Sequence, residues 1–359
     1  MKKSLIALAV LAASGAAMAQ SSVSVYGIAD VWVGSTKTTL NGVGERETKV
    51  DSAGVNTSRI GFKGTEDLGG GLKANFVIET TVKLDQPSGT SLGDRNANVG
   101  LSGGFGEVQL GRTWSSYDDI RLSANDNFNA NVAASFNTWV EYNDRPSNSI
   151  KYISPEFAGF SGSVTYGLGE DKALNANNKA SSILSLGVQY ANGPVFVGFA
   201  HQAEKAGAGT KLAALSGIND ALDLADLPAV TVPAGAKVTY NLLNGSYDFG
   251  VAKLVAGYNQ VKAKNTGLGA DLEAKEWNIG AEVPLASALK LGVGYAQSTI
   301  EALNTDIVKT SGYTATLLYS LSKRTTVYGA MYQAKAKDKV GLGVEAKETL
   351  YGVGINHKF

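Results

Sequence analysis

Charged residues recur at alternating positions along segments that read as strands, and they gather again in one long polar segment. Arg59 and Lys63 are four residues apart and so lie on one face of their segment. Glu79 and Lys83 do the same in the next segment, and Arg95 opens the segment after that. The polar segment 113–147 carries acids and bases together: Asp118, Asp119, Asp126, Glu141 and Asp144 with Arg121 and Arg145. Arginine does not lose its charge at physiological pH, and its planar guanidinium tolerates close packing. Such a set suits an electrostatic filter better than a chemical reaction.

Residue types that perform catalysis or bind metals are scarce. The chain has no cysteine and two histidines, His201 and His357, without a Ser or Cys partner at a recognisable spacing. The segment 100–104 (GLSGG) fits the Gly-x-Ser-x-Gly nucleophile pattern, but it precedes a tight turn and not a helix. Three aspartates at 220, 223 and 226 match no calcium-loop spacing, so a solvated loop is the better interpretation. We predict no enzyme, no cofactor and no metal site.

The N-terminus has the pattern of an export signal. Lys2 and Lys3 precede an apolar run over 5–13 that is too short to span a bilayer, and 17–19 (AMA) is a small-x-small cleavage pattern. The sequence therefore predicts a signal peptide at residues 1–19 with cleavage between Ala19 and Gln20. One domain, 20–359, would remain.

Charge excludes one class of partner. Without Lys2 and Lys3 the chain keeps 30 of its 32 basic residues against 32 acidic ones, a net charge of about −2. A nucleic-acid binder that relies on bulk positive charge is therefore excluded.

The last nine residues, YGVGINHKF, alternate strictly between apolar or aromatic positions and small or polar ones. They predict a strand with one apolar face and one wet face. The chain ends on Phe359, and closing strands of this kind resemble the terminal signal that the outer-membrane assembly machinery reads. An edge strand of a soluble sheet is the alternative.

Between the two ends, strand-like segments are separated by two alternating kinds of connection. Seven are short: 66–71, 103–106, 154–159, 191–193, 248–251, 284–289 and 321–324. Eight are long and polar: 34–54, 84–93, 113–147, 169–181, 204–235, 265–271, 302–309 and 337–346. Sixteen strands with short turns on one side and long loops on the other predict an all-β, antiparallel transmembrane β-barrel. A barrel of this size encloses an aqueous channel.

The faces of the predicted strands agree with a barrel in lipid. Near 290–301, Leu291, Val293 and Tyr295 alternate with glycine and alanine, so apolar side chains can face lipid while small ones face a lumen. The side chains on the outward face of the first predicted strand are unusually small: Val23, Val25, Gly27, Ala29 and Val31. Small residues let neighbouring walls approach closely, which predicts a subunit contact in a homotrimer.

Several motifs carry a resemblance to a known family. SRIGFKGTEDLGGGLKA at 58–74, NVGLSGGFGEVQLGR at 98–112 and NSIKYISPEFAGFSGSVTYG at 148–167 resemble general diffusion porins of Gram-negative beta-proteobacteria. The opening SSVSVYGIAD at 21–30 and the final strand extend the resemblance over the mature chain. It implies a 16-stranded trimeric porin whose third external loop folds inward and narrows the barrel. It also implies an outer-membrane location, among outer-membrane lipids and lipopolysaccharide.

In porins similar to this chain, an arginine cluster on the wall faces carboxylates on the inserted loop. By position, Arg59, Arg95 and Arg145 correspond to that cluster, and Asp118 and Asp119 are the candidate facing acids. The resemblance predicts a water-filled channel for small hydrophilic solutes and ions, and the wall cations predict a mild anion preference. A substrate-specific channel for sugars or organic anions stays open. Its support is the aromatic content of the loop: Trp114, Tyr117, Phe128, Phe136, Trp139 and Tyr142.

Overall fold

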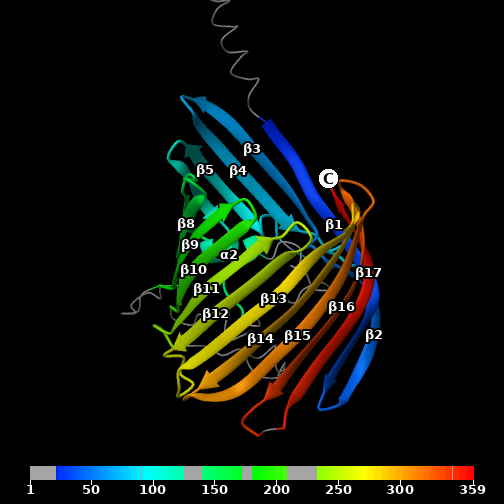
Figure 1. The fold of residues 1–359 in the computed structure, drawn as a ribbon. Helices are drawn as coiled ribbons and strands as arrows, with labels where there is room; N and C mark the ends of the chain where they lie inside the picture. The colour runs from blue at the N-terminus through cyan, green and yellow to red at the C-terminus, as the bar shows by residue number, and fades with distance from the viewer. Residues whose placement is uncertain (1–21, 90, 125–139, 172–179, 208–232, 342) are drawn as a thin grey trace, which may run out of the picture.

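The structure is a computed structural model, and it describes residues 22–89, 91–124, 140–171, 180–207, 233–341 and 343–359. The predicted signal peptide, with Ala19 and Gln20, lies outside the described residues. The described chain forms one antiparallel sheet that closes on itself around a central space (Figure 1). No helix among these residues is both long and apolar enough to cross a membrane.

Strands make up nearly all of the described chain, and one helix follows the sixth of them. The elements are β1 (Ser22–Leu40), β2 (Val43–Ser52), β3 (Arg59–Gly69), β4 (Leu72–Thr81), β5 (Asn96–Gly103), β6 (Gly106–Arg112), α2 (Ser116–Ala124), β7 (Ser149–Ile153), β8 (Phe160–Leu168), β9 (Ser182–Asn192), β10 (Val195–Lys205), β11 (Lys237–Asp248), β12 (Lys253–Lys264), β13 (Leu272–Ala286), β14 (Leu289–Ala302), β15 (Thr305–Ser320), β16 (Thr325–Asp338) and β17 (Glu345–Lys358).

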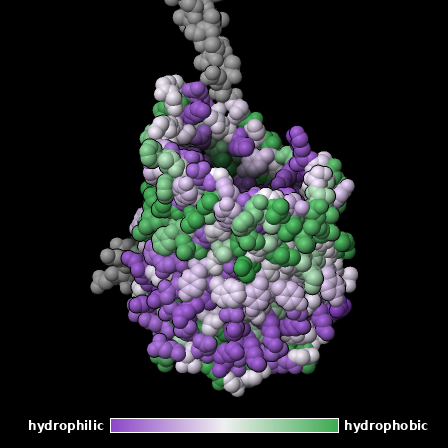
Figure 2. Space-filling view, viewed as in Figure 1, coloured by the Kyte–Doolittle hydropathy of each residue, from purple (hydrophilic) through white to green (hydrophobic). Residues whose placement is uncertain are grey.

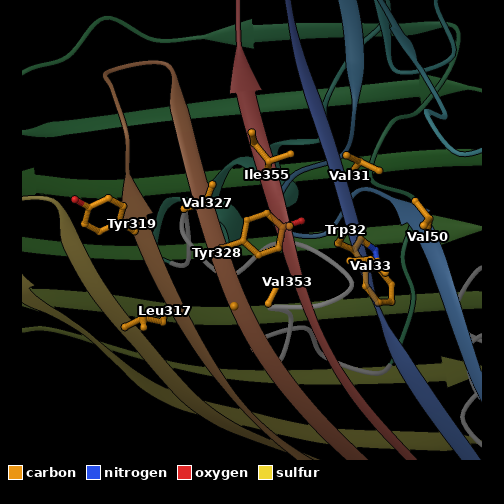
Figure 3. A pocket seen from close by; sticks show the side chains of 12 residues that line it. Val31, Trp32, Val33, Val50, Leu317, Tyr319, Val327, Tyr328, Val353 and Ile355 are labelled. Atoms are coloured by element: carbon orange, nitrogen blue, oxygen red, sulfur yellow. The ribbon is translucent and has the colours of Figure 1, made fainter.

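The barrel closes where the last strand meets the first. β17 pairs antiparallel with β1 from Ile28↔Lys358 to Leu40↔Ala346. On its other side, β1 pairs with β3 over its first part and with β2 over its later part. β2 and β3 thus share one place in the wall, and the prediction of a sixteen-strand barrel is confirmed. Figure 3 shows this seam, with Val31 and Val33 of β1 close to Val353 and Ile355 of β17.

Two of the predicted long loops are wrong. Segment 34–54 is mostly a hairpin of β1 and β2, turned at Asn41 and Gly42, which have φ of 51° and 83°. Segment 302–309 contains a two-residue turn at Leu303 and Asn304, with φ of 50° and 62°. Positive φ at both central residues is the hairpin geometry that matches strand twist. These strand ends carry polar residues on both faces, so the apolar alternation that marks a strand in the sequence is missing there.

The two faces of the sheet differ in exposure as the alternation predicted. Along β9, Leu184, Leu186 and Val188 are exposed on the outside, while Ser185 and Gly187 between them are buried on the inside. Figure 2 shows hydrophobic residues gathered in a band across the wall and hydrophilic residues toward the loop end. An apolar band around a polar interior is the pattern of a barrel that spans a membrane.

A buried carboxylate holds the break between β2 and β3. Asp30 of β1 is fully buried and accepts hydrogen bonds from the backbone N–H groups of Gly54, Val55 and Asn56, at 2.8, 3.3 and 3.0 Å. These amides lie in the break, where no neighbouring strand accepts their hydrogen bonds. The Asp30 carboxylate therefore replaces the missing ladder partners.

The same carboxylate ties the break to the closing strands. Tyr328 Oη of β16 and Asn356 Nδ2 of β17 both donate to Asp30, each at 2.7 Å. Asn356 Nδ2 also donates to Asn56 Oδ1 at 3.2 Å. Asp30 thus joins three strands of the seam to the segment that leads into Arg59.

We expect replacement of Asp30 by Ala to destabilise the barrel strongly. It leaves three backbone amides and two side-chain donors buried without their acceptor, so the free energy of unfolding falls by at least about 3 kcal/mol. Urea unfolding in lipid vesicles measures the loss. Asp67→Ala is the matched control, because the hydrogen bond that Asp67 accepts among the described residues comes from the exposed Gly69 N–H at 2.8 Å, and its loss stays within about 1 kcal/mol. Equal stability of the two variants contradicts the assignment.

Candidate functional site

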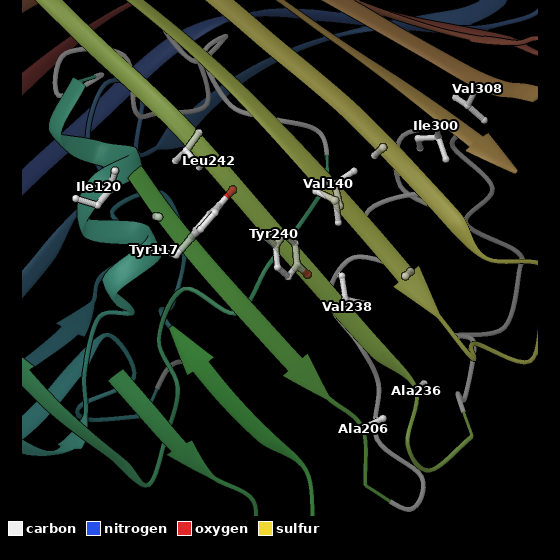
Figure 4. Close-up of a cluster of buried hydrophobic side chains, with 14 residues drawn as sticks. Tyr117, Ile120, Val140, Ala206, Ala236, Val238, Tyr240, Leu242, Ile300 and Val308 are labelled. Atoms are coloured by element: carbon white, nitrogen blue, oxygen red, sulfur yellow. The ribbon is translucent and has the colours of Figure 1, made fainter. Parts of the chain in front are cut away.

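Helix α2 of the third long connection lies on the inner face of the wall. Ser115 Oγ accepts from the Asp118 N–H at 3.1 Å and so caps the helix, and Asp118 and Asp119 in its first turn suit the helix dipole. The Tyr117 N–H donates to Ser185 Oγ at 2.8 Å, and Asn244 Nδ2 donates to the Ile120 carbonyl at 2.7 Å. Figure 4 shows Tyr117 and Ile120 against the inside of the strands.

The returning arm of the same connection is also fixed to the inner wall. The Val140 N–H donates to Glu276 Oε1 at 3.1 Å, and the Asn143 N–H donates to Glu204 Oε1 at 2.8 Å. Tyr240 Oη donates to the Glu141 carbonyl at 3.0 Å. Residues 125–139, including Asp126, lie outside the described residues. Both described arms of the third loop therefore lie inside the barrel, on the side of β8–β13.

On the other side of the lumen, two arginines meet one glutamate: Arg59 at the start of β3 and Arg95 just before β5. Glu79 Oε1 of β4 accepts from Arg95 Nε at 2.8 Å, and Glu79 Oε2 lies 3.6 Å from Arg59 Nε of β3. Tyr26 Oη of β1 donates to Glu79 Oε2 at 3.0 Å. One buried carboxylate thus holds two guanidinium groups close together on a rigid wall.

An indole ring connects this wall to the loop. The guanidinium carbons of Arg95 and Arg145 lie 5.4 and 4.9 Å from the ring centre of Trp114, so the ring is a cation–π partner of both. Arg145 Nη2 also pairs with Asp144 Oδ2 at 2.9 Å. Trp114 is therefore a shared partner of one arginine beside the wall strands and one arginine of the loop.

These groups line a polar cleft of about 420 Å³ in the lumen. Its charged lining consists of four arginines and three carboxylates, namely Arg59, Arg95, Arg121 and Arg145 with Glu79, Asp118 and Asp144. Opposed charges across a narrow aqueous path create a transverse field that orients dipolar solutes.

The predicted site residues do not all reach this cleft. Arg59, Arg95, Arg145, Glu79 and Asp118 line it. The remaining three lie outside the lining: Lys63 lies 5.1 Å from the Tyr26 ring centre, Lys83 is exposed beyond the end of β4, and Asp119 pairs with Lys151 Nζ at 2.5 Å.

Several lining or anchoring residues were not predicted. Arg121 and Tyr142 contact each other at 5.2 Å, guanidinium carbon to ring centre, and both line the cleft. Lys151 is the partner of Asp119. The alternation of β7 could have placed it on the inner face, because it lies between the exposed Ile150 and Tyr152. The contact of Arg121 with Tyr142 had no sequence signal, because it depends on how the two arms of the loop meet.

Asp118 is the acid most affected by its surroundings. Burial raises the pKa of Asp118 to about 7, against the opposing effect of the nearby Arg121 charge. Tyr142 Oη donates to Asp118 Oδ1, whereas Oδ2 has no hydrogen-bond partner among the described residues. This carboxyl therefore titrates near neutral pH.

A closed sixteen-strand barrel with an apolar outer band and a charged lumen is a channel of the bacterial outer membrane. The Gram-negative porin family model matches residues 5–339, and the chain belongs to this family. It is therefore an outer-membrane porin, a pore for passive diffusion of small solutes.

Relatives match over the whole chain. The chain is 33% identical to outer membrane porin protein 32 of Delftia acidovorans and 30% identical to a major outer membrane protein P.IB of Neisseria gonorrhoeae, with both chains fully covered in each case. Among solved structures, the anion-selective porin from Comamonas acidovorans superposes with a TM-score of 0.77 at 29% identity, over 95% of this chain and 100% of that one. OmpT of Vibrio cholerae shares the fold, with a TM-score of 0.67 at 17% identity over 94% of this chain and 98% of that one.

We expect the ion selectivity of the pore to depend on pH through Asp118. Because a pKa near 7 means that Asp118 is protonated below neutral pH, raising the pH from about 6 to about 8 adds a negative charge to the cleft. The permeability ratio of anions to cations should then fall. Reversal potentials in a salt gradient measure it, in planar bilayers at both pH values.

Two variants isolate this effect. Asp118→Asn should keep the low-pH ratio at both pH values, because its side chain carries no charge. Asp119→Asn should keep the wild-type pH step, because Asp119 pairs with Lys151 outside the cleft lining. A pH step that survives in Asp118→Asn rules out Asp118 as its source.

Proposed function

We propose that this porin conducts small hydrophilic solutes and ions with a mild preference for anions, set by Arg59, Arg95 and Arg145 in the cleft. The observation that carries the proposal is the excess of arginines over carboxylates in the cleft lining, four against three. Asp118 lowers the acidic count further when it is protonated. The name of the structurally similar Comamonas porin, anion-selective, supports the same direction.

The selectivity is set locally. Screening at physiological salt acts over about 8 Å, so a solute in the cleft responds to these side chains and not to the net charge of the chain. Arg59 stands on β3 and Arg95 directly precedes β5, and Glu79 holds both of them; Arg145 belongs to the third loop and lies against Trp114. We further propose that the third loop, whose described arms lie on the opposite wall, narrows the lumen at this level.

Replacing Arg95 by Ser should shift the reversal potential of the pore toward cations. The substitution removes one positive charge and leaves Glu79 with Arg59 as its one remaining guanidinium partner among the described residues. Planar-bilayer measurements in a salt gradient test it, and the shift should fade in concentrated salt. Lys83→Ser is the matched control, because Lys83 is exposed and outside the cleft lining. Equal reversal potentials for wild type and Arg95→Ser, or a cation-selective wild type, refute the charge assignment.

A substrate-specific channel for sugars or organic anions remains the second candidate, and its support is the aromatic content of the third loop. Tyr117 is fully buried, and Trp114 is engaged by two arginines. Neither ring is therefore placed as a free stacking surface for sugars. Phe128, Phe136 and Trp139 lie outside the described residues. Conduction that stays ohmic and is not blocked by sugars supports the general pore.

The proposal includes the assembled state and excludes enzymatic activity. Two of the similar proteins are porins by name, and we therefore propose that this chain is not an enzyme. We propose a homotrimer whose contact includes the outward face of β1, where Val23, Val25, Ala29 and Val31 are small. Gly27 is a poor probe of that contact, since a Cβ there would lie 2.4 Å from Phe359 Cζ of the same chain.

We also propose that residues 1–19 are a cleaved signal peptide and that Phe359 is read by the outer-membrane assembly machinery. Phe359 exchanges two backbone hydrogen bonds of 3.1 Å with Gly27, at the very end of the closing seam. Its ring covers Gly27, which resembles the rescue of a glycine by a cross-strand aromatic.

Deletion of Phe359 should reduce insertion far more than stability. The truncation removes two backbone hydrogen bonds and one ring contact, so the free energy of unfolding falls by about 1–2 kcal/mol. It also removes the last residue of the proposed assembly signal, which is needed before the barrel forms. Surface levels in cells, compared with the unfolding midpoint of refolded protein in vesicles, separate the two effects. Phe157→Ala, at an exposed aromatic of the β7–β8 turn, is the control. Normal surface levels of the truncated chain exclude this role.

A further inference from the structure

Lys151 of β7 is a buried cation that does not line the cleft. It lies on the inner face of the wall, and its side chain is 4% exposed. Its Nζ donates to Asp119 Oδ2 at 2.5 Å and to the Trp114 carbonyl at 3.0 Å. Burial of an unpaired charge is costly, so both oxygens contribute to keeping the ammonium group there. Lys151 is thus bound both to helix α2 and to the segment that leads into it.

The two contacts of Lys151 hold different parts of the loop. Asp119 stands in the first turn of α2, and its N–H donates to the Ser115 carbonyl at 3.1 Å. The Asp119 side chain is 38% exposed, so water can replace Lys151 as its partner. Trp114 lies in the segment 113–115, which joins β6 to α2. The bond to its carbonyl therefore fixes this segment against β7.

Backbone hydrogen bonds at the base of the third loop place Trp114 directly opposite Arg145. The two residues that flank Trp114 donate to the two carbonyls that flank Arg145: Thr113 to Pro146 at 3.4 Å and Ser115 to Asp144 at 2.7 Å. Directly opposed residues of an antiparallel pair point to the same side, so their side chains meet. The distance of 4.9 Å between the Arg145 guanidinium carbon and the indole ring centre agrees with this placement.

The indole ring keeps Arg145 close to a second arginine. The guanidinium carbon of Arg95 lies 5.4 Å from the same ring centre, and Arg95 Nε is bound to Glu79 Oε1 at 2.8 Å. Arg145 has an ion pair with Asp144 at 2.9 Å as its other charged contact among the described residues. Without the ring, repulsion from Arg95 would favour positions of Arg145 away from the cleft. The cleft would then lose positive charge.

We propose that Lys151 is a positioning residue for ion selectivity. By holding the Trp114 carbonyl, it keeps the indole ring against Arg95 and Arg145, and so keeps Arg145 in the cleft. The inference rests on the proposed anion preference, and it names a residue outside the cleft that maintains it. Two other roles of Lys151 give different results: it could anchor α2 through Asp119 alone, or act on ions directly through its own charge.

Reversal potentials in planar bilayers under a salt gradient test the proposal, with assembly of each variant checked on unheated gels. Lys151→Met cannot donate to the carbonyl, so the permeability ratio of anions to cations should fall. The expected fall is about two- to fivefold, the effect of losing one guanidinium–indole contact on the population of the bound arrangement. Trp114→Leu should lower the ratio by a similar factor.

The double variant Lys151→Met/Trp114→Leu separates positioning from a direct effect of the lysine charge. If Lys151 acts through the indole ring, the double variant should have the ratio of Trp114→Leu alone, because the two changes interrupt one chain of contacts. If the two shifts add, Lys151 acts through its own charge and the proposal is wrong.

Two single variants separate positioning from anchoring of the helix. Asp119→Asn breaks the ion pair but leaves the bond to the Trp114 carbonyl, so the ratio should not fall. Lys151→Arg keeps a cationic donor on β7 and should keep the wild-type ratio. An equal fall in Asp119→Asn and Lys151→Met, or a fall in Lys151→Arg as large as in Lys151→Met, overturns the proposal.

A further variant covers a failure of Lys151→Met to assemble. Lys151→Met/Asp119→Asn leaves no unpaired carboxylate and keeps the net charge of the wild type, and it takes the place of Lys151→Met in the same comparisons. A wild type without anion preference contradicts the proposed function. A wild type that prefers anions, with the same ratio in the Lys151 and Trp114 variants, contradicts this inference and leaves the proposed function standing.

Discussion

The pairing of β17 with β1 is the contact on which the rest of the structure depends. In a bilayer no water can accept the hydrogen bonds of an open sheet edge, so a strand wall is stable only when it closes. β1 is the long strand that makes closure possible, because it pairs with β17 along one edge and with both β2 and β3 along the other. Asp30, in the middle of β1, holds this junction and fixes the chain just before Arg59.

The charged side chains of the lumen have two roles: some hold the third loop, and others line the cleft. On the side of β10 and β13, the carboxylates of Glu204 and Glu276 accept backbone N–H groups of the third loop. These acids satisfy loop amides that strands would otherwise leave unpaired. On the side of β3 and β4, the arginines are held by a single glutamate and an indole ring, and their charge faces the cleft. The field across the pore follows from this division and not from the net charge of the chain.

Strand length varies around the barrel. β15 has 16 residues and β7 has five, so one side of the barrel extends far beyond the apolar band. The extended part meets water on both faces, where polar alternation is allowed. The same extension is the reason why loops were predicted at 34–54 and 302–309, where the structure has strands.

The sequence by itself determined the class of the fold and the inward position of Arg59, Glu79 and Arg95. Strict alternation and the short turns are local properties, and one face per strand follows from them. Only the tertiary structure decided that Asp118 enters the cleft while Asp119 turns to Lys151, and that Lys83 stays outside. Those outcomes depend on where a helix in the third loop packs against distant strands, and on where β4 ends. Neither is encoded in a repeating pattern, because both are set by contacts between residues far apart in the chain.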